Sequence, residues 1–157
     1  MAIIGIVAVA KDLAIGKDGK LPWHYSADLK HFKQTTTEQA VVMGSNTWRS
    51  LRGPLPNRLN IVLSRSAQLD TADNLIFLRN EQEVLDLSKY INCDLFIIGG
   101  SKTFAEFRDK IDAWIVTRIP IEVEGADVFM PADFLDGFSL VEQRELGDGL
   151  IAETFHR

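Results

Sequence analysis

The residues best suited to chemistry in this sequence lie between positions 15 and 33, where an acid stands among apolar side chains. Asp28 and Phe32 are four residues apart and share one face of a helix, with Leu29 beside them. A carboxylate buried on such a face is costly unless a partner pairs with it, and no Arg or Lys is spaced to do so there. One interpretation is an exposed acid that aids the helix start, which is common in first turns. The second is that the partner of Asp28 is a ligand.

Glycines at two predicted strand-to-helix junctions could bind an anion. Gly99-Gly100-Ser101 and Gly44-Ser45-Asn46-Thr47 each follow a short apolar segment and precede a predicted helix. Glycine lets the backbone approach a phosphate closely, and free N–H groups at a helix start favour negative charge. Arg65 and Lys102 add positive charge, so the junctions predict a ligand with several phosphates. The dinucleotide motif G-x-G-x-x-G follows no predicted strand, so an ordinary Rossmann site is not expected.

Other catalytic constellations have little support. Cys93 precedes a predicted strand in no reactive setting, and His24, His31 and His156 lack the spacing of metal ligands, so we expect no metal. No Ser-His-Asp arrangement follows from residue order. Hydride transfer needs no protein nucleophile because a cofactor carries the chemistry, and the sequence is compatible with that reaction.

The elements that must position these residues alternate between strands and helices. Continuous apolar segments predict strands at residues 2–10, 40–43, 59–63, 75–78, 95–98 and 113–119. Helices are predicted at about 27–36, 45–51, 81–90 and 101–110, with Ser26, then Ser45 or Asn46, then Asn80 as caps. Residues 122–131 are predicted to form an acidic loop. Residues 138–146 and 150–156 alternate in polarity around Gly147-Asp148-Gly149 and predict an antiparallel hairpin.

This alternation predicts an α/β fold, namely a single-domain three-layer sandwich over residues 1–157. Its central sheet is mixed and mostly parallel, with flanking helices and a C-terminal antiparallel hairpin. Ligands of such sheets bind beyond the carboxyl ends of the strands. That rule brings together the loop after Ala10, the two glycine junctions, and Ser64-Arg65.

Composition narrows the class of protein. The chain has 157 residues, 46% apolar and 25% charged, which is typical of one soluble globular domain. The net charge of −5, with no basic run, argues against non-specific nucleic-acid binding. The single cysteine excludes an internal disulfide framework and is typical of a reducing compartment. No apolar run reaches membrane-spanning length, and no secretory signal is recognised at the N-terminus.

A series of short motifs runs through nearly the whole chain. They are Ile15-Gly16, Leu21-Pro22-Trp23, Asp28-Leu29-x-x-Phe32-Lys33, Val42-Met43-Gly44, Thr47-Trp48, Pro54-Leu55-Pro56-Asn57-Arg58, Asn60-Ile61-Val62-Leu63-Ser64-Arg65, Ile98-Gly99-Gly100, Thr117 and Glu124-Gly125. Each is unspecific alone, but in this order and spacing they resemble the dihydrofolate reductase family of bacterial type. The fold of that family agrees with the sandwich predicted above.

The resemblance implies an oxidoreductase that uses NADPH to reduce 7,8-dihydrofolate to 5,6,7,8-tetrahydrofolate. Hydride would pass from the nicotinamide to C6 of the pteridine with protonation at N5, in support of one-carbon metabolism and of thymidylate and purine synthesis. It also implies a cytoplasmic monomer that binds antifolate inhibitors and has no nucleic-acid or membrane partner. Two rival interpretations are a pterin or flavin-precursor reductase on the same fold, and a non-catalytic nucleotide-binding module.

By the same resemblance, Asp28 would bind the amino group and ring nitrogen of the pteridine and help place the N5 proton, supported by Thr117. Leu21 and Trp23 would belong to a mobile catalytic loop over the nicotinamide. Arg58 would pair with the glutamate α-carboxylate through a bidentate contact. The substrate site would comprise Ile6, Asp28, Leu29, Phe32, Lys33, Leu51, Leu55, Arg58 and Thr117.

The resemblance also implies an NADPH site. It would comprise Ala8, Ile15, Gly16, Gly19, Leu21, Gly44, Ser45, Asn46, Thr47, Leu63, Ser64, Arg65, Arg79, Ile98, Gly99, Gly100, Ser101, Lys102, Thr103 and Phe104. The Gly99–Gly100 peptide bond is expected to be cis. Arg65 and Lys102 are expected to pair with the 2′-phosphate, with Arg79 near. Ser45 and Lys102 depart from the family pattern, since arginine is common at both positions.

Overall fold

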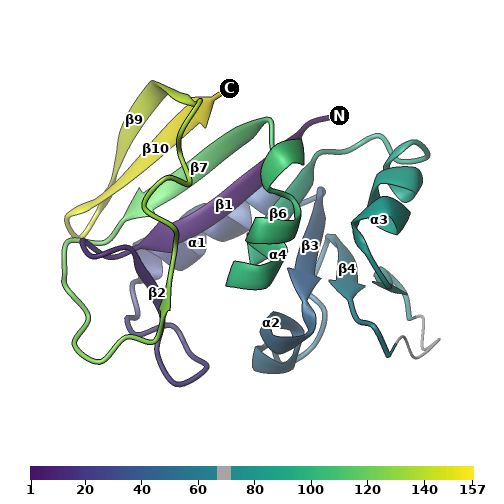
Figure 1. Ribbon diagram of the computed structural model, residues 1–157, viewed down its shortest axis with the longest axis horizontal. Coiled ribbons are helices and arrows are strands. Elements are labelled where there is room, and N and C mark those ends of the chain that lie inside the picture. The colour runs from purple at the N-terminus through teal and green to yellow at the C-terminus, as the bar shows by residue number, and fades with distance from the viewer. Residues whose placement is uncertain (67–71) are drawn as a thin grey trace.

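An eight-stranded sheet runs through the computed structural model, which describes residues 1–66 and 72–157 (Figure 1). The strand order is β5-β4-β3-β6-β1-β7-β10-β9. The strands are β1 (Ile3–Val9), β3 (Ala40–Gly44), β4 (Leu59–Leu63), β5 (Leu75–Leu78), β6 (Leu95–Gly99), β7 (Ala113–Arg118), β9 (Ser139–Gly147) and β10 (Leu150–His156). Every neighbouring pair from β5 to β7 is parallel, and β10 is antiparallel to both β7 and β9. The predicted mixed, mostly parallel sheet is therefore confirmed.

Side chains of the central strands alternate between two cores because both faces of the sheet are covered. In β3, Ala40 and Val42 belong to one core, while Val41 and Met43 belong to the other. Helices α3 (Glu81–Ser88) and α4 (Ser101–Glu106) pack on the first core. Helices α1 (Ser26–Thr36) and α2 (Ser45–Ser50) pack on the second, so that α1 lies behind the sheet and α4 in front of it in Figure 1. These are the three layers that the sequence predicted.

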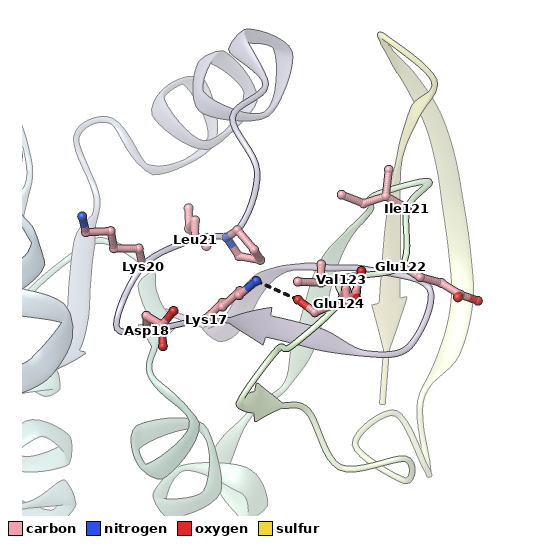
Figure 2. A pocket seen from close by; sticks show the side chains of 9 residues that line it. Lys17, Asp18, Lys20, Leu21, Ile121, Glu122, Val123 and Glu124 are labelled. Atoms are coloured by element: carbon pink, nitrogen blue, oxygen red, sulfur yellow. Dashed lines mark hydrogen bonds between the residues drawn. The ribbon is translucent and has the colours of Figure 1, made fainter.

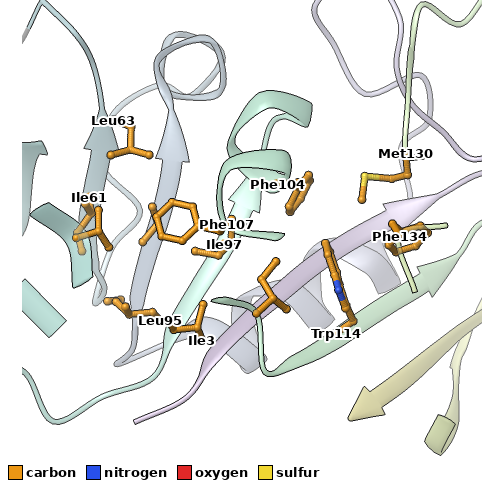
Figure 3. Packing of buried hydrophobic residues seen from close by; sticks show 14 of the residues in the cluster. Ile3, Ile61, Leu63, Leu95, Ile97, Phe104, Phe107, Trp114, Met130 and Phe134 are labelled. Carbon is orange, nitrogen blue, oxygen red and sulfur yellow. The ribbon is translucent and has the colours of Figure 1, made fainter. Parts of the chain in front are cut away.

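A run of aromatic rings anchors α4 to the sheet (Figure 3). The ring centroids of Phe104 and Trp114 are 5.4 Å apart, and those of Trp114 and Phe134 are 5.2 Å apart. Gly5 makes room for this stack, because a Cβ at that position would lie 2.5 Å from the Trp114 ring. Aromatic pairs at such distances add to burial. The stack therefore fixes the helix that follows Gly99 and Gly100.

The predicted caps of the first two helices are wrong. Helix α1 begins at Ser26 with Tyr25 as its N-cap, because the Tyr25 carbonyl already accepts the N–H of Leu29 at 3.2 Å. Helix α2 begins at Ser45 with Gly44 as its N-cap, so Ser45 and Asn46 lie inside the helix. Among the described residues, neither N-cap is satisfied by a side-chain hydrogen bond.

The cap of α3 is confirmed, but two helices end earlier than predicted. The Asn80 carboxamide oxygen accepts the N–H of Glu83 at 2.9 Å. Helix α3 then ends at Ser88, because the next hydrogen bonds are of the 3₁₀ type, between residues three positions apart. One of them runs from the Tyr90 N–H to the carbonyl of Leu87. Helix α4 ends at Glu106. A separate 3₁₀ turn, η1 (Arg108–Lys110), follows it, with a hydrogen bond from the Lys110 N–H to the carbonyl of Phe107.

Two short strands occur where only loops were predicted. Strand β2 (Ala14–Gly16) pairs antiparallel with β8 (Val128–Phe129), which lies inside the predicted acidic loop. Strands of this length carry too few residues for periodicity to reveal them. The pair links the segment after β1 to the segment after β7, and both border the site described below.

The C-terminal hairpin is confirmed, although its first strand does not show the predicted alternation of burial. Strand β9 is exposed along almost its whole length, because it forms an edge of the sheet. Of the helices in the described part of the chain, none is long and apolar enough to cross a membrane.

Candidate active site

A cleft of about 440 Å³ opens beyond the carboxyl ends of the strands, where the sheet rule places a ligand. We call it the Asp28 cleft. One wall is α1, and the opposite wall is formed by β1, α2, the end of β6 and the segment at residues 15–21. Three of the four loops predicted to meet there do line it. Ser64 and Arg65 fall outside the set of described residues that line it.

Most of the predicted site residues meet in the Asp28 cleft. From the predicted substrate site these are Ile6, Asp28, Leu29, Phe32, Leu51, Leu55 and Thr117. From the predicted cofactor site they are Ala8, Ile15, Gly16, Gly19, Leu21, Asn46, Thr47, Ile98, Gly99, Gly100, Ser101 and Phe104. Outside the described lining lie Trp23, Lys33, Gly44, Ser45, Arg58, Leu63, Ser64, Arg65, Arg79, Lys102 and Thr103.

Asp28 stands in the first turn of α1 with its carboxyl group in the cleft. Burial raises the pKa of Asp28 above its ordinary value, while the donor groups of Trp23 and Thr117 oppose the rise by stabilising the charged form. Among the described residues, no cation forms an ion pair with it. The acid is therefore held in an environment that a hydrogen-bonding ligand would improve.

Trp23 and Thr117 flank Asp28 from two different elements. Thr117 lies on β7 opposite Ala8 of β1 and is buried. Trp23 precedes α1 and is also buried, yet its indole Nε1 has no acceptor at hydrogen-bonding geometry in the described part of the chain. Its effect on the pKa of Asp28 therefore acts over a longer distance than a hydrogen bond. A buried donor without an acceptor beside a half-buried acid marks a place for a polar ligand atom or water.

His31 is a cleft residue that the sequence analysis did not assign to the site. It lies on α1 three residues after Asp28, lines the cleft and is only 6% exposed. Its Nδ1 is 3.0 Å from Nη2 of Arg144, which comes from β9, and its Nε2 is buried without a partner among the described residues. Burial and the nearby Arg144 charge both lower the pKa of His31, so the imidazole is neutral near pH 7.

Arg58 is buried beside the cleft rather than exposed at its mouth. Its side chain is held against Phe32, with Cζ 6.0 Å from the ring centroid, and Phe32 lines the cleft. Its Nε donates to the carbonyl of Pro56 at 2.9 Å, and its Nη1 donates to the hydroxyl of Thr36 at 3.0 Å. Burial lowers the pKa of Arg58, but arginine stays charged at neutral pH.

Asn60 organises the turn that carries Arg58. Its side-chain oxygen accepts the N–H of Leu55 at 2.8 Å, and its Nδ2 donates to the carbonyls of Leu55 and Arg58, both at 3.0 Å. The side chain is fully buried on β4. Asn60 was noted only as part of a motif, because its partners lie in a turn whose shape periodicity does not predict.

The glycine junctions approach each other closely at the cofactor end. A Cβ on Gly44 would lie 2.7 Å from the Thr103 hydroxyl, so only glycine allows β3 to end this near to α4. The expected cis bond between Gly99 and Gly100 is present. Among the described residues, the N-caps of α2 and α4 make no side-chain hydrogen bond, and Asn46, Thr47 and Ser101 of these first turns line the cleft. The residues present therefore suit a bound phosphate group.

A second cavity of about 570 Å³ is lined by the loop at residues 17–22 and the segment at residues 121–124 (Figure 2). There Lys17 Nζ donates to the carbonyl of Glu124 at 2.8 Å, and the N–H of Asp18 donates to Asp127 at 3.1 Å. Leu21, which is 55% exposed, borders both cavities. This cavity lacks Asp28 and the glycine junctions, so we regard the smaller cleft as the candidate active site.

Comparisons with known proteins agree with this geometry. The sequence model of the family described as "Dihydrofolate reductase" matches residues 2–150. A dihydrofolate reductase of Haemophilus influenzae is 38% identical over 126 residues, covering 80% of this chain and 76% of the relative. One of Staphylococcus aureus is 35% identical over 132 residues, covering 83% and 80%.

A solved structure also matches. It is a dihydrofolate reductase from Enterococcus faecalis, complexed with NADP(H) and RAB-propyl, and superposes with a TM-score of 0.89 at 31% identity, covering 99% of this chain and 96% of that one. With the family model and the relatives above, this shows that the chain belongs to the dihydrofolate reductase family.

Proposed function

We propose that the chain reduces 7,8-dihydrofolate to 5,6,7,8-tetrahydrofolate with NADPH, and so supplies one-carbon metabolism. The observation that carries the proposal is the acid at one end of an apolar cleft whose other end is a pair of glycine junctions. A non-catalytic nucleotide-binding module would need the glycines but not Asp28. When bound, NADPH supplies the hydride that C6 of the pteridine accepts, and a proton reaches N5.

Asp28 binds and orients the pteridine. Its carboxylate accepts hydrogen bonds from the exocyclic amino group and ring nitrogen, and these bonds offset the desolvation that raises its pKa. Thr117 supports the amino group from β7. The raised pKa also makes Asp28 more readily protonated than an ordinary carboxyl group, which helps protonation at N5.

Arg58 binds the α-carboxylate of the substrate tail. Its guanidinium lies at the Phe32 end of the cleft, and Leu51 and Leu55 line the cleft beside it. The two ends of the substrate therefore meet opposite charges, an acid for the pteridine and a guanidinium for the tail. Lys33 is exposed nearby on α1 and adds charge at the mouth.

The glycine junctions and neighbouring cations bind NADPH. Gly44 to Thr47 and Gly99 to Phe104 receive the phosphates and the nicotinamide side of the cofactor, with Ala8, Ile15, Gly16 and Gly19 across the cleft. Arg65 and Lys102, both exposed, bind the 2′-phosphate with Arg79 near, and Leu63 and Ser64 flank them. Leu21 and Trp23 close the nicotinamide pocket and exclude water.

We propose that residues 1–157 act as one domain and as a monomer in the cytoplasm.

The test of the proposed reaction is the loss of nicotinamide absorbance when the purified protein is mixed with NADPH and dihydrofolate together. Turnover with dihydrofolate supports the proposal. Oxidation of NADPH only with another pterin or a flavin precursor would contradict it and favour the rival reductase. Binding of NADPH without oxidation in the presence of any of these substrates would favour the non-catalytic module.

A further inference from the structure

Thr36 makes a contact that no role in the proposed reaction explains. It lies in the last turn of α1 and is 0% exposed. Its hydroxyl donates to the carbonyl of Phe32 at 2.8 Å and accepts a hydrogen bond from Arg58 Nη1 at 3.0 Å. The first bond fixes the direction of the hydroxyl hydrogen, so that a lone pair points to the guanidinium. The hydroxyl is therefore oriented by the helix to receive one N–H of Arg58.

Arg58 is thus held at two atoms by the chain itself. Pro56, in the turn before β4, accepts from Nε at 2.9 Å, and Thr36, on α1, accepts from Nη1 at 3.0 Å. Two bonds to a planar group fix both its position and the direction of its plane. In the described part of the chain, the remaining N–H groups on Nη1 and Nη2 are free of such bonds, and these are two nitrogens that one carboxylate can bridge.

We propose that Thr36 is a positioning residue that presents the Arg58 fork to a carboxylate on the substrate tail. The inference rests on the proposed role of Arg58 and goes beyond it by assigning the geometry of that contact to a second residue. Without the hydroxyl, one buried N–H loses its acceptor and the guanidinium turns toward other partners. Recognition of the carboxylate then suffers, while the pteridine end of the cleft does not change.

The same helix supplies a matched control. Thr35 also donates its hydroxyl to a carbonyl four residues earlier, that of His31, at 2.8 Å. The two threonines therefore make the same kind of helix-internal bond one residue apart, but only Thr36 contacts Arg58. A Thr35→Val variant removes the helix bond alone, whereas Thr36→Val removes the helix bond and the acceptor for the guanidinium.

The test compares dihydrofolate with dihydropteroate, which has the same pteridine but lacks the glutamate α-carboxylate and ends in a carboxylate on the benzoate ring, closer to the pteridine. We expect Thr36→Val to raise the KM for dihydrofolate by roughly 10-fold, in line with a lost hydrogen bond to a charged group, and the KM for dihydropteroate by less than about twofold. The kcat at saturation stays close to that of the parent. Thr36→Ser restores the hydroxyl and the parent KM, and Thr35→Val leaves both KM values unchanged. KM does not depend on the fraction of folded enzyme, so partial misfolding of a variant does not obscure the result.

Two outcomes would overturn the inference. If Thr36→Val raises both KM values equally, Thr36 acts on the whole cleft rather than on the tail. If neither KM changes, Arg58 needs no help from Thr36. A parallel Arg58→Lys variant separates the two proposals. If Arg58→Lys raises the KM for dihydrofolate and Thr36→Val does not, only the role of Thr36 is overturned. If neither variant changes that KM, the proposed role of Arg58 is overturned as well.

Discussion

Two charged side chains, Asp28 in the candidate active site and Arg58 buried beside it, have different surroundings in the folded chain. Asp28 and Arg58 are both removed from water, and burial shifts both pKa values toward the neutral form. Arg58 recovers part of that cost through fixed bonds to Pro56 and Thr36. Asp28 receives only the more distant help of Trp23 and Thr117, and no ion pair from any described residue. The chain therefore supplies fixed partners to Arg58, the proposed anchor of the substrate tail, and leaves Asp28 without an ion pair among the described residues.

Helix α1 places both groups. Asp28 lies in its first turn and Thr36, which holds Arg58, in its last. Eight residues at ~1.5 Å per residue separate these positions by about 12 Å along the helix axis. The length of the helix therefore sets the distance between the acid end and the tail end of the cleft. In the proposed function, the pteridine ring of the substrate binds at the first position and its carboxylate at the second.

The largest effect is expected from removing the charge of Asp28. Asp28→Asn keeps the shape of the side chain but cannot act as a carboxylate. We expect it to lower the rate of hydride transfer to dihydrofolate at neutral pH by roughly 10²–10⁴-fold, equivalent to ~3–5 kcal/mol of transition-state stabilisation. The rate is measured in single turnovers that follow nicotinamide absorbance.

The pH dependence of the same variant tests the reason for the loss. In the parent, the rate falls as pH rises, because the raised pKa of Asp28 keeps a proton near the ring only up to that pKa. The apparent pKa belongs to the enzyme–substrate complex rather than to Asp28 alone. In Asp28→Asn, the loss shrinks at low pH, where the substrate arrives already protonated. Turnover at the parent rate at neutral pH would make Asp28 a helix-capping acid only.

A smaller effect is expected at the other end of the cleft. Arg58→Lys keeps the positive charge but loses the planar fork that Thr36 and Pro56 hold. We expect the KM for dihydrofolate to rise by about 10- to 100-fold, while kcat and the affinity for NADPH change little. Steady-state kinetics and a fluorescence titration with NADPH measure these quantities. A fall in kcat with an unchanged KM would show that Arg58, like Asp28, acts on the reacting ring.

Local sequence patterns indicated an unusual acid at Asp28, although spacing alone left two interpretations of it open, and they did not indicate how Arg58 is held. The spacing of Asp28 and Phe32 on one helix face predicted an acid among apolar side chains, and both residues do line the same cleft. Thr36 holds Arg58 across 22 positions of sequence, and Arg144 meets His31 across 113. Contacts of that range depend on how the elements pack, which no helical or strand period contains.

The same distinction explains the errors in the fold. Buried strands were predicted because both faces of the sheet are covered and their residues are continuously apolar. Strands β2 and β8 were missed because their pairing, between residues more than a hundred positions apart, leaves no local period. The caps at Ser26 and Ser45 were wrong because a side chain that can cap a helix can equally well stand in its first turn.

An exposed arginine provides a third case for the comparison. Arg65 is exposed, unlike Arg58, and is proposed to bind the 2′-phosphate. We expect Arg65→Ala to weaken the binding of NADPH by roughly 10-fold more than the binding of NADH, because only NADPH carries that phosphate. The difference should shrink at high salt. Dissociation constants for both cofactors at two ionic strengths measure it. Equal losses for both cofactors would remove Arg65 from the phosphate site.

The smallest effect concerns the stability of the protein without ligand. The pKa of folded Asp28 lies above its ordinary value of 3.8, so between these two values the folded state binds more protons than the unfolded chain. The contribution of Asp28 to stability is therefore fully present below pH 3.8 and is lost as pH rises through the pKa of the folded state. Asparagine has no charge to desolvate. We expect Asp28→Asn to melt at a higher temperature than the parent at pH 7, and the two curves to converge toward the acid side.

Thermal unfolding of both proteins across pH, without substrate or cofactor, measures that difference, and ~2–4 °C corresponds to about 1 kcal/mol for a chain of this size. Asp28→Glu, which keeps the charge, is the control and should not gain stability at pH 7. A lower melting temperature for Asp28→Asn at pH 7 would mean that Trp23 and Thr117 already satisfy the carboxylate. Asp28 would then resemble Arg58, a charge that the chain itself stabilises, and the contrast between the two ends of the cleft would no longer hold.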